Sequence, residues 1–464
     1  MRKLLGKSAP ENSSADLSVT SAPATNTIAY RPRQSQNALH AVGAPVATFD
    51  VSRDRRAVVF AGPHILKTVV LDDPNSFDFR FNEGVDVRAA ILPPSGAKSS
   101  VSADMLNIRD AKWQGHSNIY TACANGRIFA YDVARIGAGA SQPLEYIQIQ
   151  EDSRQVNSLD INPHASSWLL SGSQDGLARV FETSAPVHSR AGLTFRQRWG
   201  TMRCIDSVRQ VKWSPGTGTE VACCTDSGVI TKWDVRLPTR PVLRINAHER
   251  ACTGISWHPD GEHLISAGAD MKVNVWDFSK DADKRQKAKY TLLMPAPIKS
   301  IAWRPGLWSA TAQSRRVAQI AVSYEDSGPR RYGTSTVQIW DLARPTNPYK
   351  EIERFDSSPE AMIWRDQDRL WTVGADGIFN QCDVAYAQKA IDRQSTSAMA
   401  FSPKGDVLMF LDERQQRARS RLAVPSKNGG AARRPREALM AQVRARRCSA
   451  LARVTPRKML LAGF

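Results

Sequence analysis

The sequence lacks the cysteine arrangements that zinc sites and disulfide frameworks require. Its 464 residues contain seven cysteines, an odd number, with no Cys-x-x-Cys pair and no Cys/His spacing suited to zinc. We interpret them as reduced, mostly buried thiols of a cytosolic or nuclear protein. They are Cys123, Cys204, Cys223, Cys224, Cys252, Cys382 and Cys448.

Long hydrophobic runs and catalytic motifs are also missing. No segment approaches the roughly 18 apolar residues of a spanning helix, and the N-terminal apolar stretch is too short for a secretion signal, so we expect only peripheral membrane association. Gly6-Lys7-Ser8 lacks the earlier glycine and the strand of a phosphate-binding loop. His248, Glu249 and His258 do not have the spacing of a zinc-protease motif. We therefore expect no enzyme, no catalytic residue, no metal and no cofactor.

Acidic residues are almost absent from the C-terminal end. Residues 414–464 hold 14 Lys/Arg and one acid, Glu437, a net charge of +13, which leaves +5 of the total of +18 for residues 1–413. The body of the chain is therefore only mildly basic. We predict that residues 413–464 form a basic, low-complexity tail.

A repeat runs through the remainder of the chain. An aromatic residue or a substitute followed by an acid recurs at intervals of 42 to 64 residues, near the period of a propeller blade. These pairs are Tyr131-Asp132, Phe181-Glu182, Trp233-Asp234, Trp276-Asp277, Trp340-Asp341 and Cys382-Asp383. Seven alternating runs, each a predicted first strand, begin near residues 46, 108, 156, 208, 252, 298 and 359.

Polar residues at fixed offsets before these pairs suggest a brace inside each blade, which must be fully hydrogen-bonded because both faces of a blade are covered. Asp270 lies six residues before Trp276, Ser266 lies ten before it, and His248 stands in the preceding connection. The same offsets give Ser171 with Asp175 and Thr372 with Asp376, while Trp233 and Trp340 keep the tryptophan. Because the aspartates recur once per repeat, we interpret them as structural and not as acid/base groups.

This pattern resembles the WD-repeat family, which implies an all-β fold, a seven-bladed β-propeller. We place the propeller at residues 28–412, after a disordered arm at 1–27, with "NTIAYRP" near residue 26 as a candidate closing strand. Residues 397–411 have the pattern of two further strands. They either close the last blade or are offered to a different chain, and the sequence does not decide between these.

A finer resemblance is carried by "SGSQDG" at 171, by residues 233–278 and by "VQIWDLARPTNPYKEIERF" at 337. These segments are similar to the N-terminal propeller of the WD-repeat subunit of the fungal SEA complex and its animal GATOR counterpart, the restriction-of-telomere-capping family. The resemblance implies a non-enzymatic scaffold in a coat-like complex on the cytoplasmic face of the vacuole membrane, linked to TOR signalling, the amino-acid response and autophagy. It also implies a helical region and a RING-like module after the propeller, neither of which this sequence contains.

The implied partners are protein subunits, including other WD-repeat propellers, with membrane association through the complex and no small-molecule substrate. The basic, aromatic segment 183–203 offers Arg196, Arg198 and Trp199 as a candidate partner contact. The main alternative is a nuclear propeller that binds histones or nucleic acid through the basic tail, and it predicts a charged or aromatic ring at the mouth of the propeller. A ubiquitin-ligase receptor is a third possibility, for which no adaptor surface is identifiable.

Overall fold

A computed structural model of the chain describes residues 38–71, 81–92, 107–138, 145–148, 154–189, 192–279, 287–306, 318–325, 336–352, 355, 357–393, 397–401, 407–411 and 453–454. These ranges fold mainly into short antiparallel strands, with two five-residue helices, α3 (Val87–Ile91) and α4 (Val133–Gly137), and a 3-10 turn (Ala390–Arg393). The chain divides into two compact units, residues 1–387 and 388–464. No helix in the described ranges is long and apolar enough to cross a membrane.

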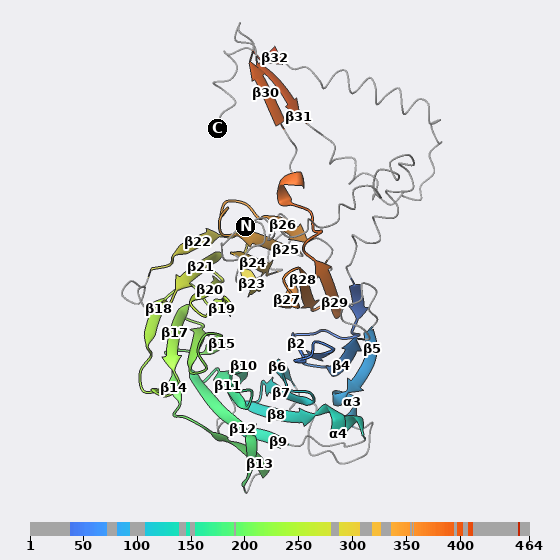
Figure 1. Ribbon diagram of the computed structural model, residues 1–464, viewed down its shortest axis with the longest axis vertical. Helices are drawn as coiled ribbons and strands as arrows, with labels where there is room; N and C mark the ends of the chain where they lie inside the picture. Colours follow the sequence, from blue (N-terminus) through green and yellow to red (C-terminus); the bar gives the residue numbers. More distant parts are fainter. Residues whose placement is uncertain are drawn as a thin grey trace, which may run out of the picture. The chain divides into compact units, whose positions relative to one another are not determined.

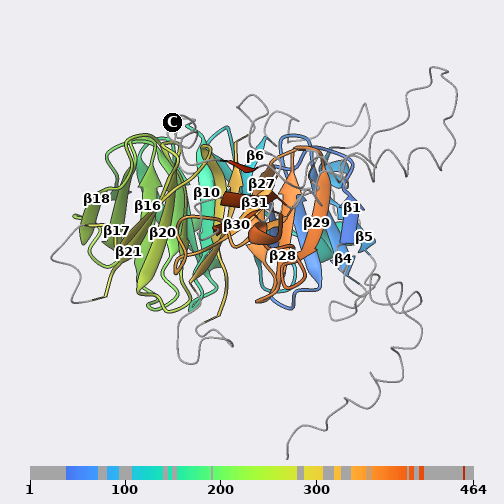
Figure 2. The ribbon, with the colours of Figure 1, turned by 90° about the horizontal axis from the view of Figure 1, so that it is seen from above.

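The first unit is a ring of seven sheets, which confirms the predicted seven-blade propeller (Figures 1 and 2). Blade 1 consists of β2 (Thr48–Val51), β3 (Ala57–Ala61), β4 (Leu66–Leu71) and β5 (Phe81–Asp86). Blade 2 consists of β6 (Ile108–Gln114), β7 (Asn118–Cys123), β8 (Arg127–Asp132) and β9 (Glu145–Gln148). Blade 3 consists of β10 (Val156–Ile161), β11 (Trp168–Ser173), β12 (Leu177–Ser189) and β13 (Gly192–Gln197), with β14 (Met202–Arg203) also paired with β12.

The remaining four blades complete the ring. Blade 4 consists of β15 (Val208–Trp213), β16 (Glu220–Thr225), β17 (Val229–Asp234) and β18 (Leu243–Asn246). Blade 5 consists of β19 (Cys252–Trp257), β20 (His263–Gly268), β21 (Lys272–Asp277) and β22 (Tyr290–Leu293). Blade 6 consists of β23 (Ile298–Trp303), β24 (Gln319–Tyr324), β25 (Val337–Asp341) and β26 (Lys350–Ile352). Blade 7 is β27 (Pro359–Trp364), β28 (Arg369–Gly374), β29 (Ile378–Asp383) and, outermost, β1 (Ala38–Ala41).

The N-terminal strand β1 closes the ring by pairing with the third strand of the last blade. Its register runs from Ala38 opposite Gln381 to Ala41 opposite Ile378. The sequence had suggested "NTIAYRP" near residue 26 for this role, and that segment lies outside the described residues. The closing strand is instead "ALHA", a four-residue stretch whose alternation is too short to stand out from the sequence alone.

In five blades, the aspartate that follows the aromatic residue or its substitute caps the turn after its strand. The carboxylate accepts a hydrogen bond from the backbone N–H two residues further on, an Asx-turn geometry that starts the outgoing connection. This bond measures 3.0 Å from Asp132 to Ala134, 3.0 Å from Asp234 to Arg236, 3.1 Å from Asp277 to Ser279, 2.9 Å from Asp341 to Ala343 and 2.9 Å from Asp383 to Ala385. The recurrence of the acid in blades 2, 4, 5, 6 and 7 thus follows from turn chemistry.

The hydrophobic core lies between neighbouring blades. Between blades 3 and 4, for example, Leu170 and Val180 pack with Trp213 and Trp233, and all four side chains are buried. Close packing extends to the backbone at Gly228, whose φ is +77° and where an added Cβ would lie 2.3 Å from the carbonyl oxygen of His248. Only glycine is compatible with that turn.

The second unit contains a separate small sheet. β30 (Ser397–Phe401) and β31 (Val407–Leu411) form an antiparallel hairpin, and β31 also pairs with β32 (Arg453–Val454). Within the described residues, this sheet shares no strand with the seven blades. The outer position of blade 7 belongs to β1, so the hairpin is not the closing element of that blade.

Candidate functional site

The structure joins His248, Ser266, Asp270 and Trp276 in one hydrogen-bonded chain in blade 5. His248 Nδ1 lies 3.0 Å from Asp270 Oδ1, and His248 Nε2 lies 2.8 Å from Ser266 Oγ. The Trp276 indole N–H donates to Ser266 Oγ at 3.0 Å. The network connects the loop before β19 with β20 and β21.

Burial lowers the pKa of His248 below its ordinary value, although the neighbouring Asp270 carboxylate opposes that shift. A neutral ring fits all three bonds: Nδ1–H donates to Asp270, and Nε2 accepts the Ser266 hydroxyl proton. The Ser266 oxygen then remains available to the Trp276 indole. Each polar group is thereby satisfied in a buried site, which makes this a structural brace.

In the other blades the same positions use different partners. Asp175 pairs with the buried guanidinium of Arg179 at 2.8 Å, where blade 5 uses a histidine. Asp376 accepts from the Ile378 N–H, and its own N–H donates to Ser357 Oγ. The indole of Trp233 donates to Thr231, and that of Trp340 to the Tyr324 hydroxyl.

Ser171 and Thr372 are buried, and within the described residues their hydroxyls have no hydrogen-bond partner. The sequence offsets therefore identify equivalent positions in the blades, but they do not predict which hydrogen-bond partner each side chain has. Arg179 and Thr231 each lie two residues before the aromatic residue of their pair. Tyr324 and Ser357 lie at other offsets, so repeat alignment alone did not identify the substitutes as one set.

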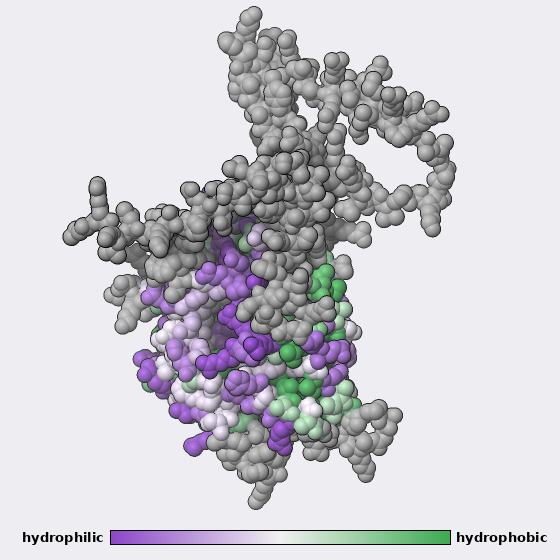
Figure 3. Space-filling model, turned by 45° about the vertical axis from the view of Figure 1, so that its right-hand side comes forward, coloured by the Kyte–Doolittle hydropathy of each residue, from purple (hydrophilic) through white to green (hydrophobic). Residues whose placement is uncertain are grey.

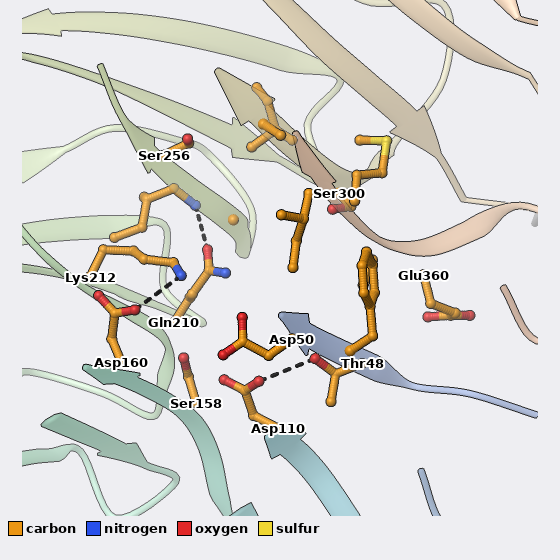
Figure 4. Close-up of a pocket in the computed structure, with 18 of the residues that line it drawn as sticks. Thr48, Asp50, Asp110, Ser158, Asp160, Gln210, Lys212, Ser256, Ser300 and Glu360 are labelled. Carbon is orange, nitrogen blue, oxygen red and sulfur yellow. Dashed lines mark hydrogen bonds and ion pairs between the residues drawn. The ribbon is translucent and has the colours of Figure 1, made fainter. Parts of the chain in front are cut away.

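The inner strands of all seven blades line a central channel with a cavity of about 520 Å³ (Figure 4). From blade 1 to blade 6, polar side chains in the channel link each blade to the next by accepting a hydrogen bond from a backbone N–H of the neighbouring inner strand. These bonds run from Trp113 to Asp50 (2.7 Å), Leu159 to Asp110 (2.8 Å), Trp213 to Asp160 (2.8 Å), Ile255 to Gln210 (2.7 Å) and Trp303 to Ser256 (3.1 Å). The channel residues thus hold blades 1 to 6 together in order.

The charges that line the channel nearly balance. Arg109, Lys112, Arg209, Lys212 and Lys299 face Asp50, Asp110, Asp160 and Glu360. Ion pairs join Lys112 to Asp110 and Lys212 to Asp160, both at 3.4 Å, and Lys299 to Glu360 at 2.9 Å. The lining therefore forms neither the ring of one charge nor the aromatic ring that the nucleic-acid alternative predicted.

Burial and nearby opposite charges shift the pKa values of two of these groups in opposite directions. Burial raises the pKa of Asp50 above its ordinary value, and Lys112 opposes that shift. Burial alone would lower the pKa of Lys112, but the negative charges of Asp110, Asp50 and Asp160 raise it above the ordinary value. Lys112 therefore stays charged beside these carboxylates, and its ion pair with Asp110 is structural.

The candidate partner contact, Arg196, Arg198 and Trp199, lies on the outer side of blade 3. The Arg198 guanidinium lies 4.7 Å from the Trp168 ring centre and 4.9 Å from that of Trp199, and it pairs with Glu182 at 3.0 Å. The two indole rings meet edge to face at 4.7 Å. Trp199 is thus partly buried against Trp168 and Arg198, while Arg196 is exposed on β13 opposite Glu182.

One group of side chains has the composition of a metal site. Ligand atoms of Asp260, Glu262 and His263 lie within 4.8 Å of one another. Asp260 Oδ2 is already 3.0 Å from His258 Nδ1 and 2.8 Å from His263 Nδ1. Partial burial opposes the shift, but these two bonds hold the pKa of Asp260 well below its usual range. The cluster serves the turn between β19 and β20.

The cysteines fit the interpretation as reduced thiols. The six cysteines in the described ranges are free and buried, and Cys448 lies outside those ranges. Cys223 and Cys224 are consecutive residues in the second strand of blade 4, where the hydrogen bond with the Cys204 thiol and then burial raise the pKa of Cys223. A protonated thiol is a poor nucleophile, so Cys223 is unreactive. Both side chains are fully buried and pack as small apolar groups.

Comparison with known proteins agrees with this geometry. The family described as WD domain, G-beta repeat matches residues 145–182 and 239–277, which fall in blades 2 to 5. The chain is a WD-repeat propeller. Among its relatives, Restriction of telomere capping protein 1 of Kluyveromyces lactis is 24% identical over 80% of this chain and 31% of its own length.

Two animal relatives align over the same share of this propeller chain. GATOR2 complex protein WDR24 of Danio rerio is 26% identical, and that of Homo sapiens is 25% identical, each over 80% of this chain and 42% of the relative. The chain therefore spans about a third to two fifths of the length of these relatives.

Proposed function

We propose that this chain is a scaffold subunit of a multi-subunit WD-repeat complex of the GATOR2 or SEA type, and that it acts by binding and not by catalysis. The observation that carries the proposal is the alignment of four fifths of the chain with proteins named for the GATOR2 complex. Two features of the structure support the scaffold role: the fully hydrogen-bonded network in blade 5, and the hydrogen bonds and ion pairs that line the channel. Both stabilise a rigid propeller, and a rigid propeller is suited to binding other proteins.

The finer role follows the resemblance seen in the sequence. We propose that the complex lies on the cytoplasmic face of the vacuole or lysosome membrane, and that the chain reaches the membrane through its partners. There it would take part in TOR kinase signalling, the amino-acid response and autophagy.

We further propose that the hairpin β30–β31 pairs with a partner propeller. The ring of the first unit closes with its own strand β1, so it does not require these two strands. In the described part of the second unit β30 is an edge strand, and adding strands to the edge of a sheet is a recognised mode of protein association. A partner with an open blade would pair with that edge.

The test is affinity purification of the tagged chain from its own cells, followed by quantitative mass spectrometry. Three forms are compared: the full chain, a chain without residues 413–464, and a chain without residues 397–411. We expect WD-repeat partners with the first two forms and loss of at least one propeller partner with the third. Recovery of histones with the full chain alone would instead support the nuclear alternative.

A further inference from the structure

Two segments on the outer side of the propeller are rich in arginine and contain no acid. Residues 192–205 and 236–246 carry six arginines and neither aspartate nor glutamate. We call this set the arginine edge: Arg196, Arg198, Arg203, Arg236, Arg240 and Arg244. All six residues are exposed.

The fold brings the two segments together. β13 and β14 are outer strands of blade 3, and β18 is the outer strand of the next blade in the ring (Figure 1). The segments meet where Gly200 packs on Pro238, so closely that a Cβ at Gly200 would lie 2.8 Å from the proline Cγ. The arginine edge is therefore one surface spanning two blades.

Most of the positive charge on this surface is uncompensated. Arg198 pairs with Glu182 at 3.0 Å and Arg236 with Asp234 at 2.6 Å. In the part of the chain that the structure describes, no ion pair involves Arg196, Arg203, Arg240 or Arg244. Four guanidinium groups thus face solvent with their donors available, which attracts an anionic partner.

Exposed apolar side chains lie within the same two segments. Leu237 is 64% exposed, Val242 is 53% exposed and Ile205 is 52% exposed. Apolar anchors surrounded by arginine are typical of protein contact surfaces. A second hydrophobic area is visible where the side carrying β4 and β5 comes forward (Figure 3).

We infer that the arginine edge docks an acidic segment of another protein, one that carries apolar side chains among its carboxylates. Arginine guanidinium groups bind the carboxylates of the partner segment through paired hydrogen bonds. The apolar side chains of that segment cover the exposed Leu237 and Val242. The occupant is not this chain's own tail, since residues 414–464 carry a net charge of +13.

A lipid surface fits less well. Insertion into a bilayer interface uses protruding aromatic rings, and Trp199 is held between Trp168 and the guanidinium of Arg198. The inference adds a contact to the proposed scaffold role but does not depend on it, because binding is measured on the isolated chain.

The test uses fluorescence anisotropy with a short synthetic peptide of glutamates and interspersed leucines. The variant combines Arg196→Glu, Arg240→Glu and Arg244→Glu. The matched control combines Arg53→Glu, Arg135→Glu and Arg250→Glu, three exposed arginines outside the arginine edge with the same change in total charge. We expect the edge variant to weaken binding at least about tenfold and the control less than about twofold.

A second variant, Leu237→Ala with Val242→Ala, keeps all charges and tests the apolar part; it should weaken binding several-fold. Circular dichroism checks that each variant is folded. Equal losses in the edge and control variants would contradict the inference, since total charge alone would explain the binding. Edge-dependent binding of phosphatidylserine vesicles without peptide binding, or self-association of the unmodified chain through this surface, would also overturn it.

Discussion

At the scale of single residues, the network in blade 5 shows how hydrogen bonds offset the desolvation of four buried polar side chains. His248, Ser266, Asp270 and Trp276 satisfy one another, and Asp270 also receives the Glu249 N–H at 3.2 Å. Removing one member leaves the others unpaired in a dry site, which costs more than the bond itself contributes. The stability of the network therefore depends more on the position of each side chain than on its charge.

Ser266→Ala removes the atom on which two of these bonds converge. The buried His248 Nε2 and Trp276 Nε1 then lose their partner, so we expect the free energy of unfolding to fall by about 1–3 kcal/mol. Urea denaturation followed by tryptophan fluorescence measures the change. Thr239→Ala, at an exposed turn, serves as the control and should stay within about 0.5 kcal/mol. An unchanged midpoint for Ser266→Ala would show that the network adds nothing to stability.

The lowered pKa of His248 predicts a pH dependence of stability. Because the unfolded histidine has the higher pKa, near 6.5, the unfolded chain takes up the proton first as pH falls. The contribution of this group is complete above that value and is lost as pH falls through it toward the folded-state pKa. The slope is at most about 1.4 kcal/mol per pH unit for one proton.

Unfolding free energies compared at about pH 7.5 and about pH 5.5 check this sign. We expect His248→Gln to lose less stability on acidification than the unmodified chain does. Replacement of the exposed His64 by glutamine should leave the difference unchanged. A His248→Gln variant that keeps the full dependence would place its origin in other groups.

At the scale of elements, the sequence predicted the repeated parts of the fold and missed the one part that does not repeat. Alternation and turn residues located all seven first strands, from β2 to β27, because each uses the same local signals. The closing strand β1 has no such signal, and its pairing with β29 joins residues more than three hundred positions apart in the chain. Likewise Arg179, which takes the place of the blade-5 histidine beside Asp175, is recognisable only from the packed structure.

Deletion of β1 should open the ring at blade 7. A chain that starts at residue 42 loses the strand that covers β29, whereas a chain that starts at residue 38 keeps it. We expect faster amide hydrogen exchange in β28 and β29 for the shorter chain only, since the edge backbone groups become accessible to solvent. Equal protection in the two chains would mean that β1 does not hold the ring closed.

At the scale of the whole molecule, the ring has a central channel whose polar groups are mostly bonded to one another, and an outer surface with groups that can bind other proteins. Backbone bonds from blade to blade and ion pairs such as Lys299–Glu360 occupy the channel, so its polar groups serve mainly the ring itself. Among the described residues, the arginine edge and the edge strand β30 offer groups for binding other proteins. The propeller thus fits a role in which several surfaces bind different proteins at once.

The most direct test of the scaffold account is the mass of the native particle that the tagged chain forms in its own cells, measured by native mass spectrometry after gentle purification. The account predicts a discrete particle several times heavier than the 51.2 kDa chain, containing this chain and other WD-repeat subunits in fixed ratio. A particle with the mass of the chain alone, or one without further WD-repeat proteins, would contradict it.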